Sequence, residues 1–318
     1  MIAAQFVISL DFELLWGVRD NQDRETYGRN ILGARQAIPQ MLALFEYAGV
    51  AATWATVGFL FCGTKDELMA ALPPQNLWPR YDNPRLSSYN YLDEVGVDER
   101  RDPYYFGKSL IRQIRATPNQ EIATHTFAHS YCLEPGQNIQ TLRADLKAAL
   151  DLASAQGITL SSIVFPRNQY GEEHIQLCLE MGLTKFRGNP VSCLYSSRKQ
   201  SEQKAILRGL RLIDAYTGAF DPAFDHRNDV SSENIRATRF LRPATGMQSL
   251  FHRAHLGVIK RGMTHAARQG KSYHLWWHPH NFGKNIDMNI HGLQDILYHY
   301  RNLQDQYGMS SVTMADHP

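Results

Sequence analysis

Two histidines separated by three residues are the clearest chemical signal in the sequence. His125 and His129 stand in the run His-Thr-Phe-Ala-His, directly after a short apolar segment. If the chain is helical there or turns once, both imidazoles project from one face and can share a metal ion. Two unrelated, partly buried histidines would give the same spacing. The position after an expected strand, with acidic residues at another strand end, favours a metal site.

A pair of acidic residues follows another apolar run. Asp11 and Glu13 come directly after residues 6–10, which read as a buried strand. Side chains two residues apart leave the same face of a strand. Two carboxylates this close do not ionise independently, and a metal ion or another cation relieves the conflict. One carboxylate could bind the metal while the other acts as a base. A helix N-cap or a surface ion pair is the alternative.

Two more expected strand ends carry polar candidates. Arg167 follows Pro166, and its guanidinium could hold a carboxylate at two points and keep it ionised. A surface arginine at a turn is the alternative. His278 follows the strand expected at residues 273–277 and lies between His274 and His280 in the run His-Leu-Trp-Trp-His-Pro-His. A histidine at such a tip suits proton donation near neutral pH, whereas aromatic packing is the other explanation of the run.

The elements that must position these residues alternate along the chain. Strands are expected at residues 6–10, 50–57, 121–124, 162–165, 273–277 and 311–314. Helical patterns cover residues 30–48, 138–156, 172–181, 248–269 and 289–307, with Pro39 marking a helix start. Strands that alternate with helices predict a parallel sheet, open or closed into a barrel. The carboxyl ends of parallel strands gather on one face, where such folds place active sites.

Two long stretches interrupt this alternation. Residues 62–106 are rich in proline, tyrosine and aspartate, and residues 188–245 are polar and irregular. Long loops in a compact domain are often functional. The aromatic side chains of the first stretch could stack on sugar rings, or pack in a core or lid. We expect one catalytic domain over residues 1–318, with insertions at about 62–106 and 188–245.

The composition excludes several classes of protein. The net charge is +2 and no basic tract is present, so a nucleic-acid partner is not expected. The four cysteines lack a CxxC spacing and are expected to be reduced thiols. No run reaches the roughly 18 apolar residues of a membrane span, and the start lacks the basic region of a signal peptide. A cytoplasmic protein is therefore expected. The oligomeric state does not follow from the sequence.

The order of these motifs resembles that of the polysaccharide deacetylases, which are carbohydrate esterase family four or the NodB-homology group. The resemblance covers roughly residues 5–283. Its strongest pieces are Ser-Leu-Asp-Phe-Glu ending at Glu13, Thr-His-Thr-Phe-Ala-His ending at His129 and Leu-Trp-Trp-His ending at His278. The longer blocks at residues 9–20 and 276–283 are similar to a bacterial branch associated with surface-polysaccharide, or O-antigen, gene clusters.

The resemblance implies a fold, a cofactor and a reaction. The implied fold is an α/β, distorted (β/α)7 barrel of the TIM-barrel-like, NodB-homology kind. It also implies a divalent metal, most often Zn²⁺ with Co²⁺, Ni²⁺ or Fe²⁺ possible, held by Glu13, His125 and His129. Such enzymes remove acyl groups from acetylated sugars. By the same resemblance Asp11 would be the general base, oriented by Arg167, and His278 would be the general acid.

The sequence departs from the usual family pattern at three points. Family members more often carry a second aspartate where this chain has Glu13, which is one methylene longer, so either Glu13 or Asp11 could be the acidic ligand. The third motif has Pro166 before Arg167 rather than after it. The usual Asp-Trp pair that supports the acid histidine is missing, and Asp214 is the stand-in.

The expected function is therefore removal of an acetyl or other acyl group from an N-acylated sugar, in surface-polysaccharide or lipopolysaccharide biosynthesis. A cytoplasmic enzyme would meet a biosynthetic intermediate and not the mature polymer. Two alternatives stay open. One is hydrolysis of another non-peptide C–N bond, as in allantoinase-like or deformylase chemistry. The other is a catalytically inactive, sugar-binding relative.

Overall fold

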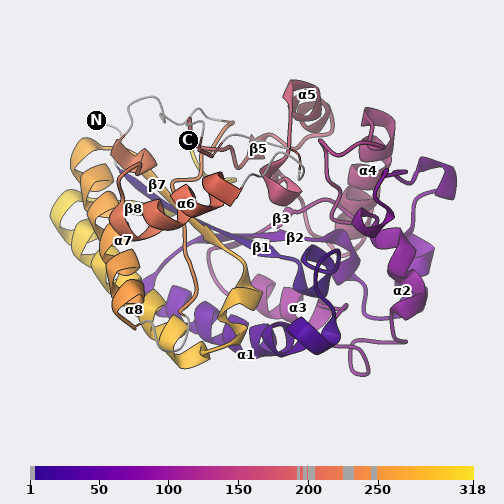
Figure 1. The fold of residues 1–318 in the computed structure, drawn as a ribbon, viewed down its shortest axis with the longest axis horizontal. Coiled ribbons are helices and arrows are strands. Elements are labelled where there is room, and N and C mark those ends of the chain that lie inside the picture. Colours follow the sequence, from indigo (N-terminus) through magenta and orange to yellow (C-terminus); the bar gives the residue numbers. More distant parts are fainter. Residues whose placement is uncertain (1–3, 192–193, 196–198, 200–204, 225–232, 245–248) are drawn as a thin grey trace.

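The core of the molecule is a curled parallel sheet (Figure 1). The computed structural model describes residues 4–318 apart from 192–193, 196–198, 200–204, 225–232 and 245–248. Its strands are β1 (Gln5–Phe12), β2 (Ala52–Thr56), β3 (Gln120–Thr124), β4 (Ser162–Ile163), β5 (Lys185–Phe186), β6 (Arg239–Phe240), β7 (Ser272–Trp277) and β8 (Ser310–Val312).

The strand order makes the sheet an incomplete ring. Neighbouring strands follow the order β5-β4-β3-β2-β1-β7-β6, β8 pairs with the start of β1, and all these pairs are parallel. The segment before β6 then reaches back to β5. The Phe186 N–H donates to the Glu233 carbonyl, and the Ile235 N–H donates to the Phe186 carbonyl, each at 2.9 Å. The expected distorted (β/α)7 barrel is confirmed, and we call the junction that these bonds bridge the seam.

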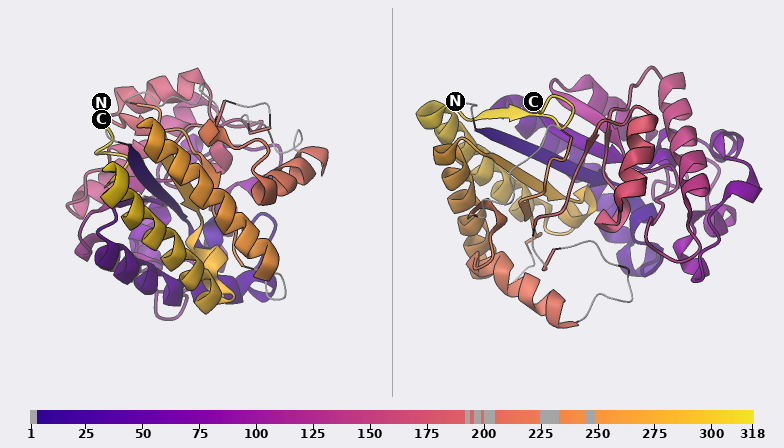
Figure 2. Two further views of the ribbon diagram at one scale, coloured as in Figure 1. Left: turned by 90° about the vertical axis from the view of Figure 1, so that its left-hand side faces the viewer. Right: turned by 90° about the horizontal axis from the view of Figure 1, so that it is seen from above.

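Helices cover the outside of the sheet. They are α1 (Arg24–Ala48), α2 (Lys65–Ala71), α3 (Lys108–Ala116), α4 (Ile139–Ala155), α5 (Glu172–Glu180), α6 (Ala205–Thr217), α7 (Ser249–Gln269) and α8 (Ile286–Tyr307). Helices α7 and α8 lie side by side on one flank, next to α1 (Figure 2). Within the described residues, no helix is both long and apolar enough to cross a bilayer.

Helix α1 starts earlier than its apolar pattern predicts. Its N-cap is Asp23, whose carboxylate accepts the Thr26 N–H while the Thr26 hydroxyl accepts the Asp23 N–H. Pro39 lies inside the helix, so the expectation that it marks a helix start is wrong. A proline there removes one backbone hydrogen bond. The burial of Ile38 and Met41 on either side of Pro39 offsets that loss.

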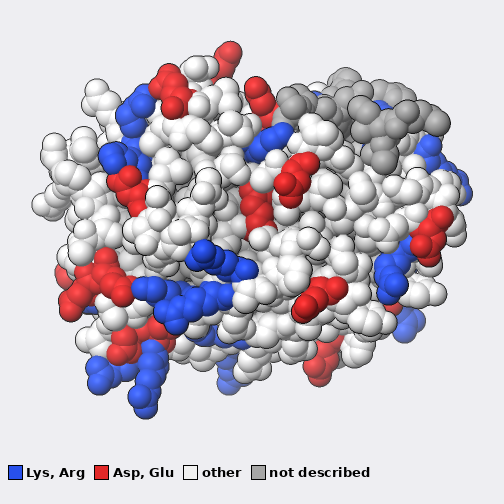
Figure 3. Space-filling model, turned by 180° about the vertical axis from the view of Figure 1, so that it is seen from behind, with Lys and Arg blue, Asp and Glu red and all other residues white. Residues whose placement is uncertain are grey.

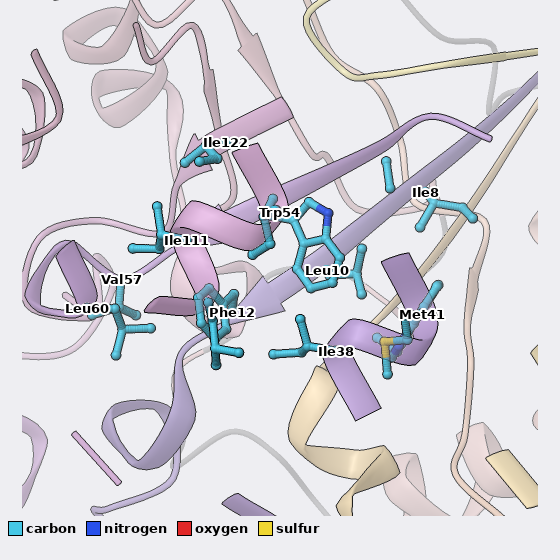
Figure 4. Packing of buried hydrophobic residues seen from close by; sticks show 14 of the residues in the cluster. Ile8, Leu10, Phe12, Ile38, Met41, Trp54, Val57, Leu60, Ile111 and Ile122 are labelled. Atoms are coloured by element: carbon cyan, nitrogen blue, oxygen red, sulfur yellow. The ribbon is translucent and has the colours of Figure 1, made fainter. Parts of the chain in front are cut away.

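Strand β1 is buried on both faces, as parallel strands between two layers usually are. One face points toward the helices, where Ile8, Leu10 and Phe12 lie close to Ile38 and Met41 of α1 (Figure 4). The other face points into the barrel. There a small apolar cluster fills the interior, made of Val7, Ala55, Val164, Ile235 and Met314.

The inward face of β1 changes character toward its carboxyl end. Val7 is apolar, whereas Ser9 and Asp11 on the same face are buried polar residues. Because all strands are parallel, this end of the barrel also receives the loops that follow β3, β5 and β7. The fold therefore gathers polar side chains at one end of an otherwise packed barrel.

The aromatic residues of the first long stretch are mostly structural. Trp78 stacks on Tyr89 with 4.3 Å between ring centroids, and Tyr89 packs edge-on against Phe59. Tyr81 donates to the Tyr131 carbonyl and is itself buried. Core packing thus explains these rings, in line with one of the two expected roles. On the face seen in Figure 3, acidic side chains lie beside the basic ones, and the residues that the structure describes form no extended basic surface there.

Candidate active site

The loop that carries the two histidines begins where β3 ends. The His125 N–H donates to the Thr56 carbonyl at 2.9 Å, which continues the β2–β3 pairing by one residue. The chain then turns sharply, because Thr126 and His129 adopt positive φ angles of 61° and 56°. The segment is therefore a single turn and not a helix. Left-handed backbone is costly for such residues and persists where the surroundings hold it in place.

Asp145 of α4 supplies that hold. Its carboxylate accepts the N–H groups of Phe127 and Ala128 at 2.7 and 3.0 Å and the hydroxyl of Ser130 at 2.9 Å. Burial raises the pKa of Asp145 to about 6 although these hydrogen bonds lower it. A carboxylate on the buried face of α4 thus fixes the backbone of the histidine loop.

Glu13 and the two histidines converge on one point. Oε2 of Glu13 lies 3.2 Å from Nε2 of His125 and 3.0 Å from Nε2 of His129. One ligand atom from each lies within 4.8 Å of the others. All three side chains are buried. Burial raises the pKa of Glu13, but the nearby rings of His278, His125 and His129 outweigh burial and hold that pKa well below its ordinary value.

This arrangement fits a tetrahedral metal ion. Ligands at about 2.0–2.2 Å from such an ion lie about 3.3 Å from one another, close to the separations seen here. The Nδ1–H of His125 donates to the Val164 carbonyl at 2.7 Å. Because a carbonyl only accepts, Nε2 of His125 keeps its lone pair for a metal. Among the described residues, Glu13 and not Asp11 shares this cluster.

Asp11 is bound by Arg187, which follows β5. Nη1 and Nη2 of Arg187 lie 2.6 and 2.8 Å from Oδ1 and Oδ2 of Asp11. Both side chains are buried. Burial raises the pKa of Asp11, but Arg187 and then the nearby histidines lower it more, so the pKa lies below its ordinary value. Asp11 is thus held as a carboxylate.

Arg167 does not contact Asp11, and the contact expected between them is wrong. Its guanidinium pairs with Asp20 and lies over the Tyr131 ring, 4.2 Å from the centroid. Arg167 sits in a short 3-10 turn after β4 with φ of 55°, which directs it toward the loop after β1. Arg187, from the next strand of the barrel, takes the position beside Asp11.

His278 faces both carboxylates. Its Nε2 lies 3.5 Å from Oδ2 of Asp11 and 3.6 Å from Oε1 of Glu13. Its side chain is 24% exposed, whereas those of Asp11 and Glu13 are 3–4% exposed, so His278 is the member of the group that solvent or substrate can reach. The His278 ring also stacks on His280, with 5.1 Å between centroids.

Asp214 is not the partner of His278. Its carboxylate lies 2.7 Å from Nη1 of Arg239 and accepts the Tyr195 hydroxyl at 2.5 Å. On the Nδ1 side of the His278 ring lies Asn281, whose Nδ2 is 3.5 Å from that nitrogen. The stand-in role expected for Asp214 is therefore wrong, because an ion pair with Arg239 occupies this carboxylate.

His274 supports the Asp11–Arg187 pair from inside the barrel. Its Nδ1–H donates to the Ile235 carbonyl at 3.0 Å, so its Nε2 accepts the Ser9 hydroxyl at 2.8 Å. Ser9 in turn accepts from Nη1 of Arg187 at 3.0 Å. Burial lowers the pKa of His274 to about 3, which keeps the ring neutral. Burial has the same effect on His280.

Two residues of the site were not expected from the sequence. Arg187 follows a two-residue strand that is too short to show a period, so nothing in the sequence marks it as lying at a strand end. Asp145 did leave a signal, because it lies between Leu142 and Leu146 on the buried face of an amphipathic helix. A charged residue on the buried face of a helix is expected to have a hydrogen-bond or ion-pair partner.

A cavity of about 270 Å³ adjoins the site. Its lining includes His278, Arg167 and Asn168. His278 lines the cavity, whereas Glu13, Asp11, His125 and His129 do not, so the cavity meets the group of site residues at His278.

Comparisons with known proteins show the fold. No family model and no curated protein matches the sequence. A Mycobacterium smegmatis structure classed as a polysaccharide deacetylase has a TM-score of 0.55 and 10% identity, covering 98% of this chain and 94% of that one. A Pseudomonas aeruginosa structure classed likewise has a TM-score of 0.51 and 13% identity, covering 94% and 85%. The PuuE allantoinase has a TM-score of 0.52 and 12% identity, covering 99% and 89%. The fold that the motifs implied is confirmed.

Proposed function

We propose that this chain, which has the fold of the polysaccharide deacetylases, is a metal-dependent hydrolase that removes an acetyl or related acyl group from an N-acylated sugar. The observation that carries the proposal is the position of Glu13 between two sets of partners. Oε2 meets His125 and His129, and Oε1 lies 3.6 Å from Nε2 of His278. The three candidate metal ligands thus lie next to Asp11 and His278, the two residues that would transfer protons.

Glu13, His125 and His129 would hold the metal. Their nitrogen and oxygen donors suit Zn²⁺, and Co²⁺, Ni²⁺ or Fe²⁺ as well. When bound, such an ion would activate water and polarise the acyl carbonyl. The chain's own part in this is to present three converging donors, one of them fixed by the bond from His125 to the Val164 carbonyl.

Asp11 would accept the proton of the attacking water. Arg187 holds Asp11 ionised and oriented, and each carboxylate oxygen keeps a further lone pair for that proton. The role that the family resemblance gave to Arg167 passes to Arg187 in this proposal. Arg187 positions Asp11 and does not itself meet substrate.

His278 would protonate the leaving nitrogen. An amine must gain a proton to leave, because its anion is a very poor leaving group. The Nε2 of His278 lies between the carboxylates, and its ring lines the neighbouring cavity. The sugar would then lie on the cavity side of His278, and the acyl carbonyl would lie on the metal side.

A second candidate is hydrolysis of a different non-peptide C–N bond. The likeness to an allantoinase fold favours keeping it. The same groups would act on a ring amide, so the substrate and not the site separates the two. A catalytically inactive sugar-binding protein is less well supported, because the triad, the base and the acid are all present.

Release of acetate or formate from a panel of acylated sugars tests the proposal. The panel would pair sugar nucleotides and lipid-linked sugars of surface-polysaccharide biosynthesis with allantoin. Acyl release that His278→Ala abolishes and His291→Ala spares would support it, since His291 is exposed on α8. Turnover of allantoin alone would move the assignment to the second candidate. No turnover of any substrate by metal-loaded protein would overturn both.

A further inference from the structure

The cavity beside His278 has an unusual lining. Four arginines contribute to it, Arg167, Arg211, Arg239 and Arg242, and no aspartate or glutamate of the described residues does. Cavities that bind neutral sugars need donors and acceptors in balance. A lining with guanidinium groups and no carboxylate suits an anion.

Two of these four arginines, Arg239 and Arg167, already form ion pairs with carboxylates. Arg239 lies 2.7 Å from Asp214 and 2.9 Å from Asp221, and its side chain is 3% exposed. Arg167 pairs with Asp20. Within the described part of the chain, Arg242 differs from both, because its half-buried side chain makes no ion pair and no side-chain hydrogen bond.

The backbone of Arg242 is nevertheless fixed. Arg242 follows β6, and the Leu241 N–H before it donates to the Trp276 carbonyl of β7 at 2.8 Å. The Arg242 N–H donates to Nε2 of His255 at 3.0 Å, while Nδ1–H of His255 donates to the Ala215 carbonyl at 2.8 Å. These hydrogen bonds thus anchor the backbone of a residue whose charged group has no partner among the residues that the structure describes.

We propose that this cavity binds an anionic substituent of the sugar substrate, a phosphate or a carboxylate, and that Arg242 recognises it. This inference rests on the proposed function. Phosphate and carboxylate share the pair of oxygens that a guanidinium binds at two points. A partly buried cation is screened less by salt than a surface one, so its interaction with an anion is stronger.

The position of the cavity sets where that anion lies on the substrate. His278 lines the cavity and also faces Asp11. A sugar whose nitrogen is protonated by His278 would therefore extend past this ring into the cavity. Trp276 and Phe240 line the same space, and Phe240 packs edge-on against His278. These rings offer apolar faces to a sugar ring, while Arg242 receives its charged group.

Calorimetric titration of the purified protein tests the site without relying on turnover. The probes are N-acetylglucosamine, its 1-phosphate, its uridine diphosphate ester and N-acetylglucosaminuronic acid. We expect at least one anionic probe to bind about tenfold more tightly than the neutral sugar, a difference of about 1.4 kcal/mol. The phosphate and uronate arms identify the source of the charge. Equal affinities for the neutral and all anionic probes would overturn the inference.

Variants at two arginines assign the effect. Arg242→Gln should abolish the preference, Arg242→Lys should keep part of it, and Arg253→Gln, at an exposed position of α7, should leave it unchanged. A preference that survives both Arg242 variants would overturn the role of Arg242. If anionic probes bind through Arg242 but no acyl group is released from any substrate, the site stands and the proposed hydrolase activity fails.

Discussion

The guanidinium of Arg187 holds both oxygens of Asp11, with Nη1 to Oδ1 at 2.6 Å and Nη2 to Oδ2 at 2.8 Å. Neither residue is near the other in the sequence, and each lies just past or near the end of its own strand. Since burial alone would raise the pKa of Asp11, the lowered value depends first on this contact. The pair therefore links the ionisation of Asp11 to the correct assembly of the barrel.

Arg187→Gln should shift the pH dependence of activity. Without Arg187, burial is less opposed and the pKa of Asp11 rises. Because the base must be ionised, the acid limb of the kcat/KM profile should move to higher pH. Removing one partner of a buried ion pair also costs stability, about 3–5 kcal/mol in general, so thermal unfolding must be followed in parallel.

Two further variants make this test specific. Arg187→Lys keeps the charge and should restore part of the shift. Arg167→Gln, which affects the pair with Asp20, should leave the acid limb in place. An acid limb that moves in Arg167→Gln and not in Arg187→Gln would reverse the assignment.

Metal content should separate the two carboxylates. Glu13→Gln and His125→Ala should lose bound metal, whereas Asp11→Asn should keep it and lose most turnover. Elemental analysis of the purified variants, alongside His291→Ala as a surface control, measures this directly. Loss of metal in Asp11→Asn with retention in Glu13→Gln would exchange the two roles.

Asp145→Ala should weaken the histidine loop without touching a ligand. It would leave two backbone N–H groups and the Ser130 hydroxyl without their acceptor. We expect a loss of on the order of 2–4 kcal/mol in the free energy of unfolding, measured by urea titration. Metal affinity should fall as well, because the strained turn loses its support.

Asp151→Asn is the matched control on the same helix. Asp151 makes an exposed ion pair with Lys147, and its side chain is 64% exposed, so its removal should change stability very little. Equal losses in the two variants would show that α4 as a whole, and not the carboxylate of Asp145, supports the loop.

The sequence predicts most of the long elements, but it misses helix α6 (Ala205–Thr217) and the two-residue strands β5 and β6. The strand motifs before Asp11 and His125 and the helix containing Asp145 have clear periods, because they bury one or both faces along several turns or residues. Strands β5 and β6 have two residues each, too few for a period to appear. Arg187 was missed for that reason, while Arg167 was visible beside Pro166.

The roles of Glu13 and Arg167 illustrate the same limit. Sequence spacing places Asp11 and Glu13 on one side of β1, but which carboxylate meets the histidines depends on the path of the loop after β3. That path follows from two left-handed residues and from Asp145 on another helix. Contacts between segments that are distant in the sequence cannot be predicted from the spacing of residues within one segment.

Acid should destabilise the protein partly through His255. Burial lowers its pKa from 6.5 to about 4. The unfolded chain therefore binds a proton near pH 6.5 while the folded chain does not, so this contribution to stability is complete above pH 6.5 and is lost as the pH falls toward 4. His255→Gln should show a smaller loss of unfolding free energy over that interval.

The comparison needs a histidine that is exposed in the folded protein. His291→Gln should retain the wild-type slope of stability against pH, because His291 is exposed on α8. Chemical denaturation at several pH values measures each slope. Identical slopes in wild type and His255→Gln would rule out this source of acid sensitivity.

The seam between β5 and the segment before β6 gives the barrel a place to open. Two backbone hydrogen bonds at Phe186 and one from the Ala237 N–H to the Gly188 carbonyl bridge it, and Arg187 lies between Phe186 and Gly188. Fluctuations that break a few contacts cost less than global unfolding. Fraying there would withdraw the guanidinium from Asp11 while the rest of the sheet stayed intact. On heating, activity would then be lost below the temperature of global unfolding. Faster amide hydrogen exchange at Phe186 would accompany that loss.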